Sequence, residues 1–438
     1  MRACLFVGLL SLTAVTSLPR ETRGALNGVR VESIFARGYA GSSVNVIAGL
    51  QHSLISRDAL QYAAFYDEEG ALVLAQRRRP GGVWVSARTA YRANVRDAHN
   101  TVAIGVDGAG FLHVAFDHHN QPLNYARSRA PGSLELGPKL SMTGRLEREV
   151  TYPAFLPLPG GDLLFFYRHG GSGRGDLVLN RYRVAEGTWT QVHANLVSGE
   201  GRRNAYVSTT VDGQGRIHAA WVWRETPDVA TNHDLCYARS DDGGLTWSDS
   251  NGRRLPVPIT ADTAEYALRI PQQRSLMNPP AIAADEQGEP VLANYWAPEG
   301  SDVPQYHVVH KVAGRWRVGV VTARATAFVL RGTATKRPPL SRSILAVRDG
   351  RALLVFRDDE HGGRVTGYVA DAPGLSTWKR HLLTREGVGA WEPSFDPIAF
   401  RDHGAVEMLL QRVEQNDGSD HAAAAAEPTP VQVLHWEP

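Results

Sequence analysis

Apolar and polar residues alternate along the chain in short runs, and the long apolar repeats of amphipathic helices are almost absent. What recurs is a turn that is often Gly-rich, then an apolar or alternating run, then a second such run. GFLHVAFD at 110–117, followed by LNYARS at 123–128, is one example. This pattern predicts an all-β protein built from strand pairs.

Seven such units follow one another, mostly about 50 to 60 residues apart. The first runs cover 58–67, 110–117, 161–169, 215–224, 288–296, 350–358 and 404–412, and the second runs cover 71–77, 123–128, 176–182, 234–240, 306–311, 365–370 and 431–436. Self-similarity at this period is typical of a β-propeller. A two-sheet sandwich repeated twice is the alternative, but seven roughly equal units fit it poorly. We therefore predict a single seven-bladed β-propeller domain over 25–438.

The first residues have the composition of a secretory signal peptide. Arg2 precedes an uncharged apolar run, and the small residues Val15 and Ser17 permit cleavage after 17. A signal peptide over 1–17 predicts a secreted or periplasmic protein; the alternative is a buried N-terminal strand or helix. No later segment is long and apolar enough to cross a bilayer, so we expect no membrane span in the mature chain.

Two local segments stand out from the repeats. SDDGGLTW at 240–247 matches the Asp-box pattern S-x-D-x-G-x-T-W, in which Asp242 bonds nearby backbone N–H groups and Trp247 packs. This motif predicts a structural turn rather than a site. EQNDGSDHAAAAAEPTP at 414–430 has low complexity and predicts a flexible loop, after which the last strand can return to complete a blade.

Charge and composition exclude several functions. The 47 Lys and Arg nearly balance the 45 Asp and Glu, which argues against a nucleic-acid partner. No dinucleotide fingerprint opens a helix and no P-loop occurs, so a nucleotide cofactor is not expected. Cys4 lies in the predicted signal peptide, which leaves Cys236 without a disulfide partner. His233 and Cys236 in NHDLC are weak metal candidates and leave open a structural calcium or zinc ion.

Histidine, tyrosine and arginine residues gather at the ends of successive strands. They are His99 in DAHN, His119 in DHHN, Tyr152 in TYPAF, Arg168 in FFYRH and Tyr206 in RRNAYVS. Because equivalent ends of neighbouring blades converge on the axis of a propeller, we expect these side chains to share one pocket. His113 and His218 lie inside alternating strands instead, and we expect them to be structural.

This set suits proton abstraction beside a carboxylate. An arginine holds and neutralises the carboxylate, which acidifies the neighbouring C–H, while a tyrosine or histidine takes the proton. Such chemistry requires no cofactor. Two of these residues could instead have a purely structural role. Tyr152 would then be a packed aromatic side chain, and Arg168 would form an ion pair with Asp176.

From about residue 40 to its end, the chain resembles the BNR-repeat seven-bladed propellers that include ulvan lyases and L-rhamnose-α-1,4-D-glucuronate lyases. The motifs DAHN, DHHN, TYPAF, YRHGGSGRG and RPPLSRS carry the resemblance. In those lyases two histidines twenty residues apart and a tyrosine sixteen residues before an arginine form the site. The same spacings separate His99 from His119 and Tyr152 from Arg168.

The resemblance implies a polysaccharide lyase that cleaves rhamnose–uronate linkages in ulvan or plant gum by β-elimination. It implies that Tyr152 is the base and acid, that Arg168 neutralises the uronate, and that His99 assists in neutralisation or proton transfer. It assigns substrate binding to His119, Tyr206 and Arg337.

Two alternatives remain open from the residues. A glycoside hydrolase, either an α-L-rhamnosidase or a sialidase-like enzyme, needs paired carboxylates or an arginine triad, and no convincing set is present. A non-catalytic glycan-binding propeller would more naturally show exposed aromatic residues. Only the lyase leaves an unsaturated uronate in its product.

Overall fold

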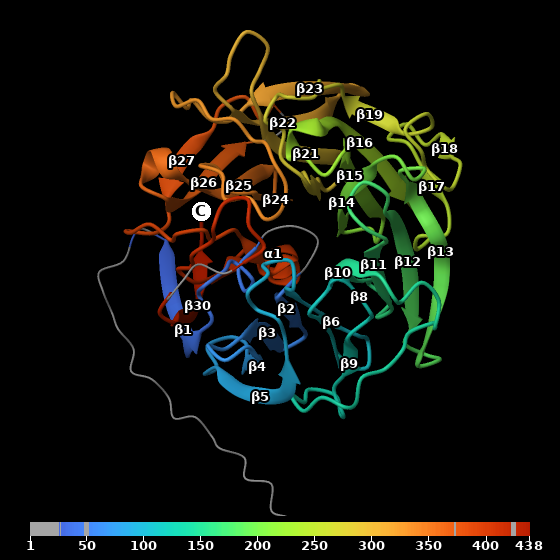
Figure 1. The fold of residues 1–438 in the computed structure, drawn as a ribbon, viewed down its shortest axis with the longest axis vertical. Helices are drawn as coiled ribbons and strands as arrows, with labels where there is room; N and C mark the ends of the chain where they lie inside the picture. Colours follow the sequence, from blue (N-terminus) through green and yellow to red (C-terminus); the bar gives the residue numbers. More distant parts are fainter. Residues whose placement is uncertain (1–25, 27, 48–51, 372–373, 422–425) are drawn as a thin grey trace, which may run out of the picture.

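A computed structural model describes residues 26, 28–47, 52–371, 374–421 and 426–438. Seven antiparallel sheets stand around a central axis (Figure 1). The prediction of an all-β, seven-bladed β-propeller is therefore confirmed. The predicted signal peptide at 1–17 lies outside the described residues and stays a prediction.

The first three blades carry the N-terminal half of the ring. Blade one contains β2 (Leu54–Arg57), β3 (Leu60–Tyr66), β4 (Ala71–Arg78) and β5 (Val85–Arg92). Blade two contains β6 (Val102–Val106), β7 (Leu112–Phe116) and β9 (Tyr125–Arg127). Blade three contains β8 (His119–Gln121), β10 (Val150–Pro157), β11 (Leu163–His169), β12 (Asp176–Arg183) and β13 (Thr188–Ser198).

Blades four to six continue the ring. Blade four contains β14 (Asn204–Val211), β15 (Ile217–Arg224), β16 (Asn232–Ser240), β17 (Trp247–Ser248), β18 (Arg254–Leu255) and β19 (Glu265–Leu268). Blade five contains β20 (Ala281–Ala284), β21 (Pro290–Trp296), β22 (Gln305–Val312) and β23 (Arg315–Val320). Blade six contains β24 (Ile344–Arg348), β25 (Arg351–Asp358), β26 (Arg364–Asp371) and β27 (Lys379–Leu382).

The last blade joins the two ends of the chain. It contains β1 (Val29–Gly38), β28 (Ser394–Phe395), β29 (Val406–Leu410) and β30 (Thr429–Trp436). β1 pairs antiparallel with β30, from Val29 opposite Trp436 to Gly38 opposite Thr429. The N-terminal strand is thus the outermost strand of the final blade and closes the ring, as in Figure 1.

Helical structure in the described ranges is short: the 3-10 turns η1 (Val229–Thr231) and η2 (Asp359–His361), and the helix α1 (Pro397–His403). Asp396 caps α1 by accepting hydrogen bonds from the N–H groups of Ile398 and Ala399. No helix in these ranges has the length and apolar character needed to span a membrane.

The core lies between neighbouring blades. Leu164 and Leu179 of blade three pack in one buried cluster with Ile217 and Trp221 of blade four, because alternate side chains of each strand face the adjacent sheet. The turn at 240–247 contributes to the same cluster, which also contains Trp247. Within that turn the side chain of Asp242 accepts hydrogen bonds from the N–H (2.9 Å) and hydroxyl (2.7 Å) of Thr246.

The segment predicted as a flexible loop at 414–430 has a different character at each end. Thr429 and Pro430 belong to β30, which lies between β1 and β29. These neighbouring strands stabilise an extended conformation that the low-complexity sequence does not predict. Residues 414–421 are tied to distant parts of the chain: Glu414 N–H donates to Ala40 and Gly418 N–H to Thr335. Residues 422–425 lie outside the described part of the chain.

Candidate active site

A cavity of about 60 Å³ lies where the ends of several blades meet. It has room for several water molecules. Its titratable wall is formed by His99, Tyr152, Tyr206, Arg224, Lys336 and Arg342. These residues come from β10 of blade three, from β14 and β15 of blade four, and from the loops that lead into β6 of blade two and β24 of blade six. Segments of four blades thus contribute to one small space.

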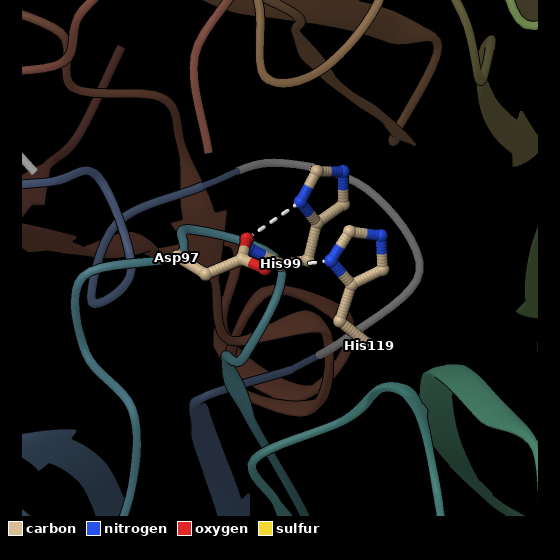
Figure 2. Close-up of side chains that lie close together, drawn as sticks. All are labelled: Asp97, His99 and His119. Carbon is tan, nitrogen blue, oxygen red and sulfur yellow. Dashed lines mark hydrogen bonds and ion pairs between the residues drawn. The ribbon is translucent and has the colours of Figure 1, made fainter. Parts of the chain in front are cut away.

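Asp97 joins two histidines beside this cavity. His99 lies in the loop between β5 and β6, and His119 is the first residue of β8. Nδ1 of His99 lies 2.7 Å from one carboxylate oxygen of Asp97, and Nδ1 of His119 lies 2.6 Å from the other. The two rings stack with centroids 3.9 Å apart and an angle of 17° (Figure 2).

The shared carboxylate determines which ring nitrogens are available. Burial raises the pKa of Asp97, but hydrogen bonds from His119 and His99 outweigh it and hold that pKa well below its usual range. An ionised carboxylate only accepts hydrogen bonds, so each Nδ1 carries the proton that it donates to Asp97. Burial lowers the pKa of His99 below its ordinary value of 6.5, and its neutral ring therefore keeps an unprotonated Nε2.

The same three residues are the one group among the described residues whose donor atoms lie close enough to hold a metal ion. Their geometry fits hydrogen bonding better. Ligand atoms about 2.1 Å from one ion are separated by about 3 Å or more, whereas the nitrogen–oxygen distances here are 2.6 and 2.7 Å. The stacked rings also point their second nitrogens side by side rather than toward one point (Figure 2).

Two tyrosine–arginine couples occupy equivalent places in blades three and four. The guanidinium of Arg168 lies 5.0 Å from the ring centroid of Tyr152, and that of Arg224 lies 5.3 Å from the ring centroid of Tyr206. The two tyrosine rings are 6.0 Å apart. Each tyrosine lies near the start of the first long strand of its blade, and each arginine lies at the end of the next strand.

The two tyrosines differ in acidity. Burial, reinforced by Tyr206, raises the pKa of Tyr152 to about 12, so its hydroxyl keeps its proton. Burial also acts on Tyr206, but the charges of Arg224 and Arg168 outweigh it and lower the pKa of Tyr206 below its ordinary value. Arg224 Nη1 donates a hydrogen bond of 3.2 Å to the Tyr206 hydroxyl oxygen, which stabilises the deprotonated form of Tyr206.

Tyr152 has an unusual backbone. Its φ is 56°, in the left-handed region that residues other than glycine and asparagine rarely adopt. The residue lies in a break of the β10–β11 register between Thr151 and Ala154. Bulges of this kind redirect a side chain, and strained residues of this kind cluster at functional sites. At this bulge Tyr152 lines the cavity and also packs against the apolar cluster that contains Tyr206.

Two buried guanidiniums have no carboxylate partner among the described residues. Arg224 is 8% exposed and Arg168 is 6% exposed. Their guanidiniums donate to neutral backbone carbonyls, that of Pro227 for Arg224 and that of Gly170 for Arg168. A buried charge without an ion pair is costly. These two arginines therefore provide a strongly favourable environment for an anionic group.

The other two cations on the wall are already paired. Nη1 of Arg342 lies 2.9 and 3.0 Å from the carboxylate oxygens of Glu392. Nζ of Lys336 lies 2.8 Å from Asp417. Arg224 is thus the cavity-lining cation whose charge is least compensated within the described chain.

The structure brings together most of the residues singled out from the sequence. His99, Tyr152 and Tyr206 line the cavity. His119 stacks on His99, and Arg168 lies over Tyr152. Arg337 is placed differently: its guanidinium pairs with Asp359 and donates to the Gly389 carbonyl, and it is absent from the described wall of the cavity.

Several residues of the site were not predicted from the sequence. Asp97 lies two positions before His99 in DAHN, and that proximity was the available signal. Arg224 is the last residue of β15 and Arg168 is the last but one of β11, so the repeat of the blades was the available signal for Arg224. Lys336 and Arg342 belong to a long loop between blades. Arg342 is part of the RPPLSRS motif, but no local pattern identified either residue as part of the cavity wall.

The weak metal candidates have other surroundings. Nε2 of His233 lies 2.8 Å from Glu225, and its Nδ1 lies 3.1 Å from Asp234, so both ring nitrogens are engaged. Cys236 is fully buried in the apolar cluster between blades three and four, and burial raises the pKa of its thiol well above the ordinary value. Neither residue belongs to the metal-compatible group found within the described ranges.

Fold and cavity together define a β-propeller in which histidine, tyrosine, arginine and lysine side chains from several blades line one cavity. The chain belongs to the BNR repeat-containing family, whose model matches residues 60–324.

An ulvan lyase of Nonlabens ulvanivorans is 22% identical over 283 residues. That match covers 56% of this chain and 58% of the lyase, so the chain matches less than two thirds of the relative's length. Two solved structures are also similar. The polysaccharide lyase Uly1 has a TM-score of 0.67 at 16% identity, covering 93% of this chain and 99% of that one. An ulvan lyase bound to -[GlcA(1-4)Rha3S]- has a TM-score of 0.65 at 15% identity, covering 90% and 94%. At these identities the structural similarities establish the shared fold.

Proposed function

We propose that the protein is a polysaccharide lyase that cleaves rhamnose–uronate linkages of an ulvan-type polymer by β-elimination. One observation carries the proposal: two buried arginines without a carboxylate partner in the described chain lie beside a neutral histidine and a protonated tyrosine. The arginines suit an anionic sugar, and the other two groups suit removal and donation of a proton.

In this proposal the uronate carboxylate binds at Arg224, with Arg168 adding positive charge behind Tyr152. Neutralising the carboxylate lowers the cost of the negative charge that develops when the neighbouring carbon loses its proton. An arginine is suited to this task because its fork of N–H groups matches a carboxylate.

His99 is the proposed base and Tyr152 the proposed acid. Nε2 of His99 takes the proton from C5 of the uronate, the C5–H electron pair forms the C4=C5 double bond, and the C4–O4 bond breaks. Tyr152, whose pKa is about 12, gives its proton to the departing O4. This assignment narrows the role expected from the resemblance, in which Tyr152 served as both base and acid, because a tyrosine that keeps its proton is a better donor than acceptor.

The remaining residues bind or orient in this proposal. His119 stacks against His99 and shares its carboxylate, so it fixes the plane of the base. Tyr206 holds Arg224 through its hydroxyl. Arg337 has no part here, because Asp359 engages its guanidinium.

Two similarities support the choice of substrate. The relative from Nonlabens ulvanivorans is an ulvan lyase, and one structurally similar lyase was solved with a glucuronate–rhamnose oligosaccharide. Secretion is part of the same proposal, because a polymeric substrate cannot enter a cell intact and the first residues have the pattern of a signal peptide.

The test is to mix the purified protein with ulvan and follow the ultraviolet absorbance of the conjugated uronate, while measuring released rhamnose separately. We expect absorbance to rise, and Arg224→Gln to lower kcat/KM by roughly 100- to 1000-fold, as loss of a charge-stabilising group does. Arg254→Gln, an exposed arginine of the same blade, is the matched control and should leave the rate unchanged. Released rhamnose without absorbance would instead indicate a hydrolase, and binding without product a glycan-binding propeller.

A further inference from the structure

A segment from the last blade reaches the wall of the cavity. We call residues 414–421 the acidic strap, because Glu414, Asp417 and Asp420 supply its charge. It follows β29, and its first residue is anchored to the chain before blade one by the hydrogen bond from Glu414 N–H to Ala40. Gln415 adds a second anchor by accepting a hydrogen bond of 3.3 Å from Ser43 N–H.

The other end of the strap holds two residues of the cavity wall, Thr335 and Lys336. The carboxylate of Asp420 accepts hydrogen bonds from the N–H (3.0 Å) and hydroxyl (3.2 Å) of Thr335. The N–H of Gly418 donates to the Thr335 carbonyl at 2.8 Å. Three hydrogen bonds thus fix one wall residue, which belongs to the loop between blades five and six.

The strap also reaches the proposed base. The Thr335 hydroxyl lies 3.3 Å from Nδ1 of His99, and an Asp420 carboxylate oxygen lies 3.5 Å from the same nitrogen. His99 therefore has two carboxylates near one ring nitrogen: Asp97 within hydrogen-bond distance and Asp420 just beyond it.

We propose that Asp420 is a positioning residue of the active site: it fixes Thr335 against His99 and places a second negative charge beside the protonated form of that imidazole. The kinetic part of this inference rests on the proposed function, whereas the electrostatic part concerns His99 alone. Asp420 lies 85 residues from Thr335 in the chain, so this contact comes from the fold and not from closeness in the sequence.

The charges that face His99 come from several elements. They are Asp97 in its own loop, His119 of β8, Tyr152 of β10, Asp420 of the strap and, across the cavity, Lys336, Arg224 and Arg342. The neighbouring His119 lowers the pKa of His99, while Asp97 and Asp420 act in the opposite direction. Burial has the largest influence and lowers the pKa of His99. The two carboxylates raise that pKa, so they partly restore the basicity that burial takes away.

Substitutions can separate the charge from the hydrogen bonds. Asp420→Asn keeps an oxygen that accepts from Thr335 but removes the charge. Asp420→Ala removes both, and Asp420→Glu keeps the charge. Asp417→Asn is the matched control, because Asp417 lies in the same strap, pairs with the Lys336 ammonium and accepts a hydrogen bond from Arg337 N–H. Within the described chain it makes no hydrogen bond or ion pair with His99.

The first measurement is an NMR titration of histidine-labelled full-length protein, in which the His99 signal is identified by its loss in His99→Gln. We expect the His99 midpoint to move to lower pH in Asp420→Asn and to return in Asp420→Glu, while Asp417→Asn leaves it in place. An unchanged midpoint in Asp420→Asn, or an equal shift in Asp417→Asn, would overturn the inference. Because no substrate is present, this result stands even if the lyase proposal fails.

Kinetics then test the positioning. The acid limb of kcat/KM should move to lower pH in Asp420→Asn, because the base loses its proton more readily once a neighbouring carboxylate is gone. Asp420→Ala should in addition lower kcat at the optimum by about tenfold, through loss of hydrogen bonds to a charged acceptor. A profile identical to that of the unsubstituted protein in both variants would show that the strap serves only to hold the loop.

Discussion

The protein pairs aspartate with histidine in two settings, inside the blades and beside the cavity. Two buried triads share one arrangement, Asp107–His113–Tyr125 in blade two and Asp212–His218–Tyr237 in blade four. In each triad the aspartate lies 3.1 Å from Nε2 of the histidine, and the tyrosine hydroxyl lies 2.7 Å from Nδ1. The histidine is fully buried in both.

In the cluster at the cavity, the aspartate binds the other nitrogen of the imidazole ring. Asp97 binds Nδ1 of His99, and no partner for Nε2 is found within the described ranges. The His99 side chain is 14% exposed, against 0% for His113. A carboxylate partner therefore does not mark a functional histidine in this protein. The distinguishing features are the free nitrogen and its access to a cavity.

The largest expected effect separates the two settings by activity. His99→Gln should lower kcat by roughly 100- to 10,000-fold, because it removes the proton acceptor. It should lower the free energy of unfolding by only about 1 kcal/mol, because the glutamine amide can still donate a hydrogen bond to Asp97. Kinetics on ulvan and denaturant unfolding measure both. A variant that retains its rate would remove His99 from the mechanism.

A smaller loss of activity should follow Asp97→Asn. The amide presents an oxygen and an NH₂ group, so it can no longer accept a hydrogen bond from both imidazoles, and one ring must move its proton to Nε2. We expect kcat to fall by roughly 100-fold. Asp241→Asn, at an exposed position, is the control. If activity survived Asp97→Asn, the shared carboxylate would be a structural feature like those of the triads.

The triads should show the opposite behaviour. His113→Phe leaves the buried Asp107 without its imidazole partner and Tyr125 without an acceptor, which should lower the free energy of unfolding by about 2–4 kcal/mol. The turnover rate of the folded fraction should stay unchanged. Urea unfolding and active-site titration check these outcomes, and a loss of turnover without a loss of stability would contradict the comparison.

The smallest effect concerns two neighbours in the sequence, His118 and His119. Burial, aided by the charge of Lys139, lowers the pKa of His118 from 6.5 to about 3, and its Nε2 accepts a hydrogen bond from Asn124 N–H. Since the folded pKa lies below the unfolded one, protonation favours unfolding. The contribution is intact above pH 6.5 and is lost as the pH falls toward 3.

This residue alone should therefore cost about 2 kcal/mol of unfolding free energy between pH 7 and pH 5. Denaturant unfolding at the two pH values measures the loss, and His118→Gln should reduce it by that amount. His421→Gln, at an exposed position, should not. An equal pH dependence in all three proteins would mean that His118 titrates normally.

Much of this architecture was accessible from local patterns. The seven strand pairs predicted from turns and apolar runs correspond to β3–β4, β7–β9, β11–β12, β15–β16, β21–β22, β25–β26 and β29–β30. A hairpin is encoded over a few residues, since alternation sets the face of each strand and the turn sets the register. His99, Tyr152 and Tyr206 were accessible for a related reason, because a regular ring brings equivalent strand ends together.

What depended on the tertiary structure was contact between distant segments. β1 closes the ring by pairing with β30, and Asp420 lies 3.2 Å from the Thr335 hydroxyl and 3.5 Å from Nδ1 of His99. The choice of Arg224 rather than Arg337 as a cavity cation was also decided there, because Asp359 lies next to one guanidinium and no described carboxylate pairs with the other. Local patterns determine which residues are available at the strand ends, whereas burial and charge pairing, which are properties of the packed ring, decide which of them remain free to act.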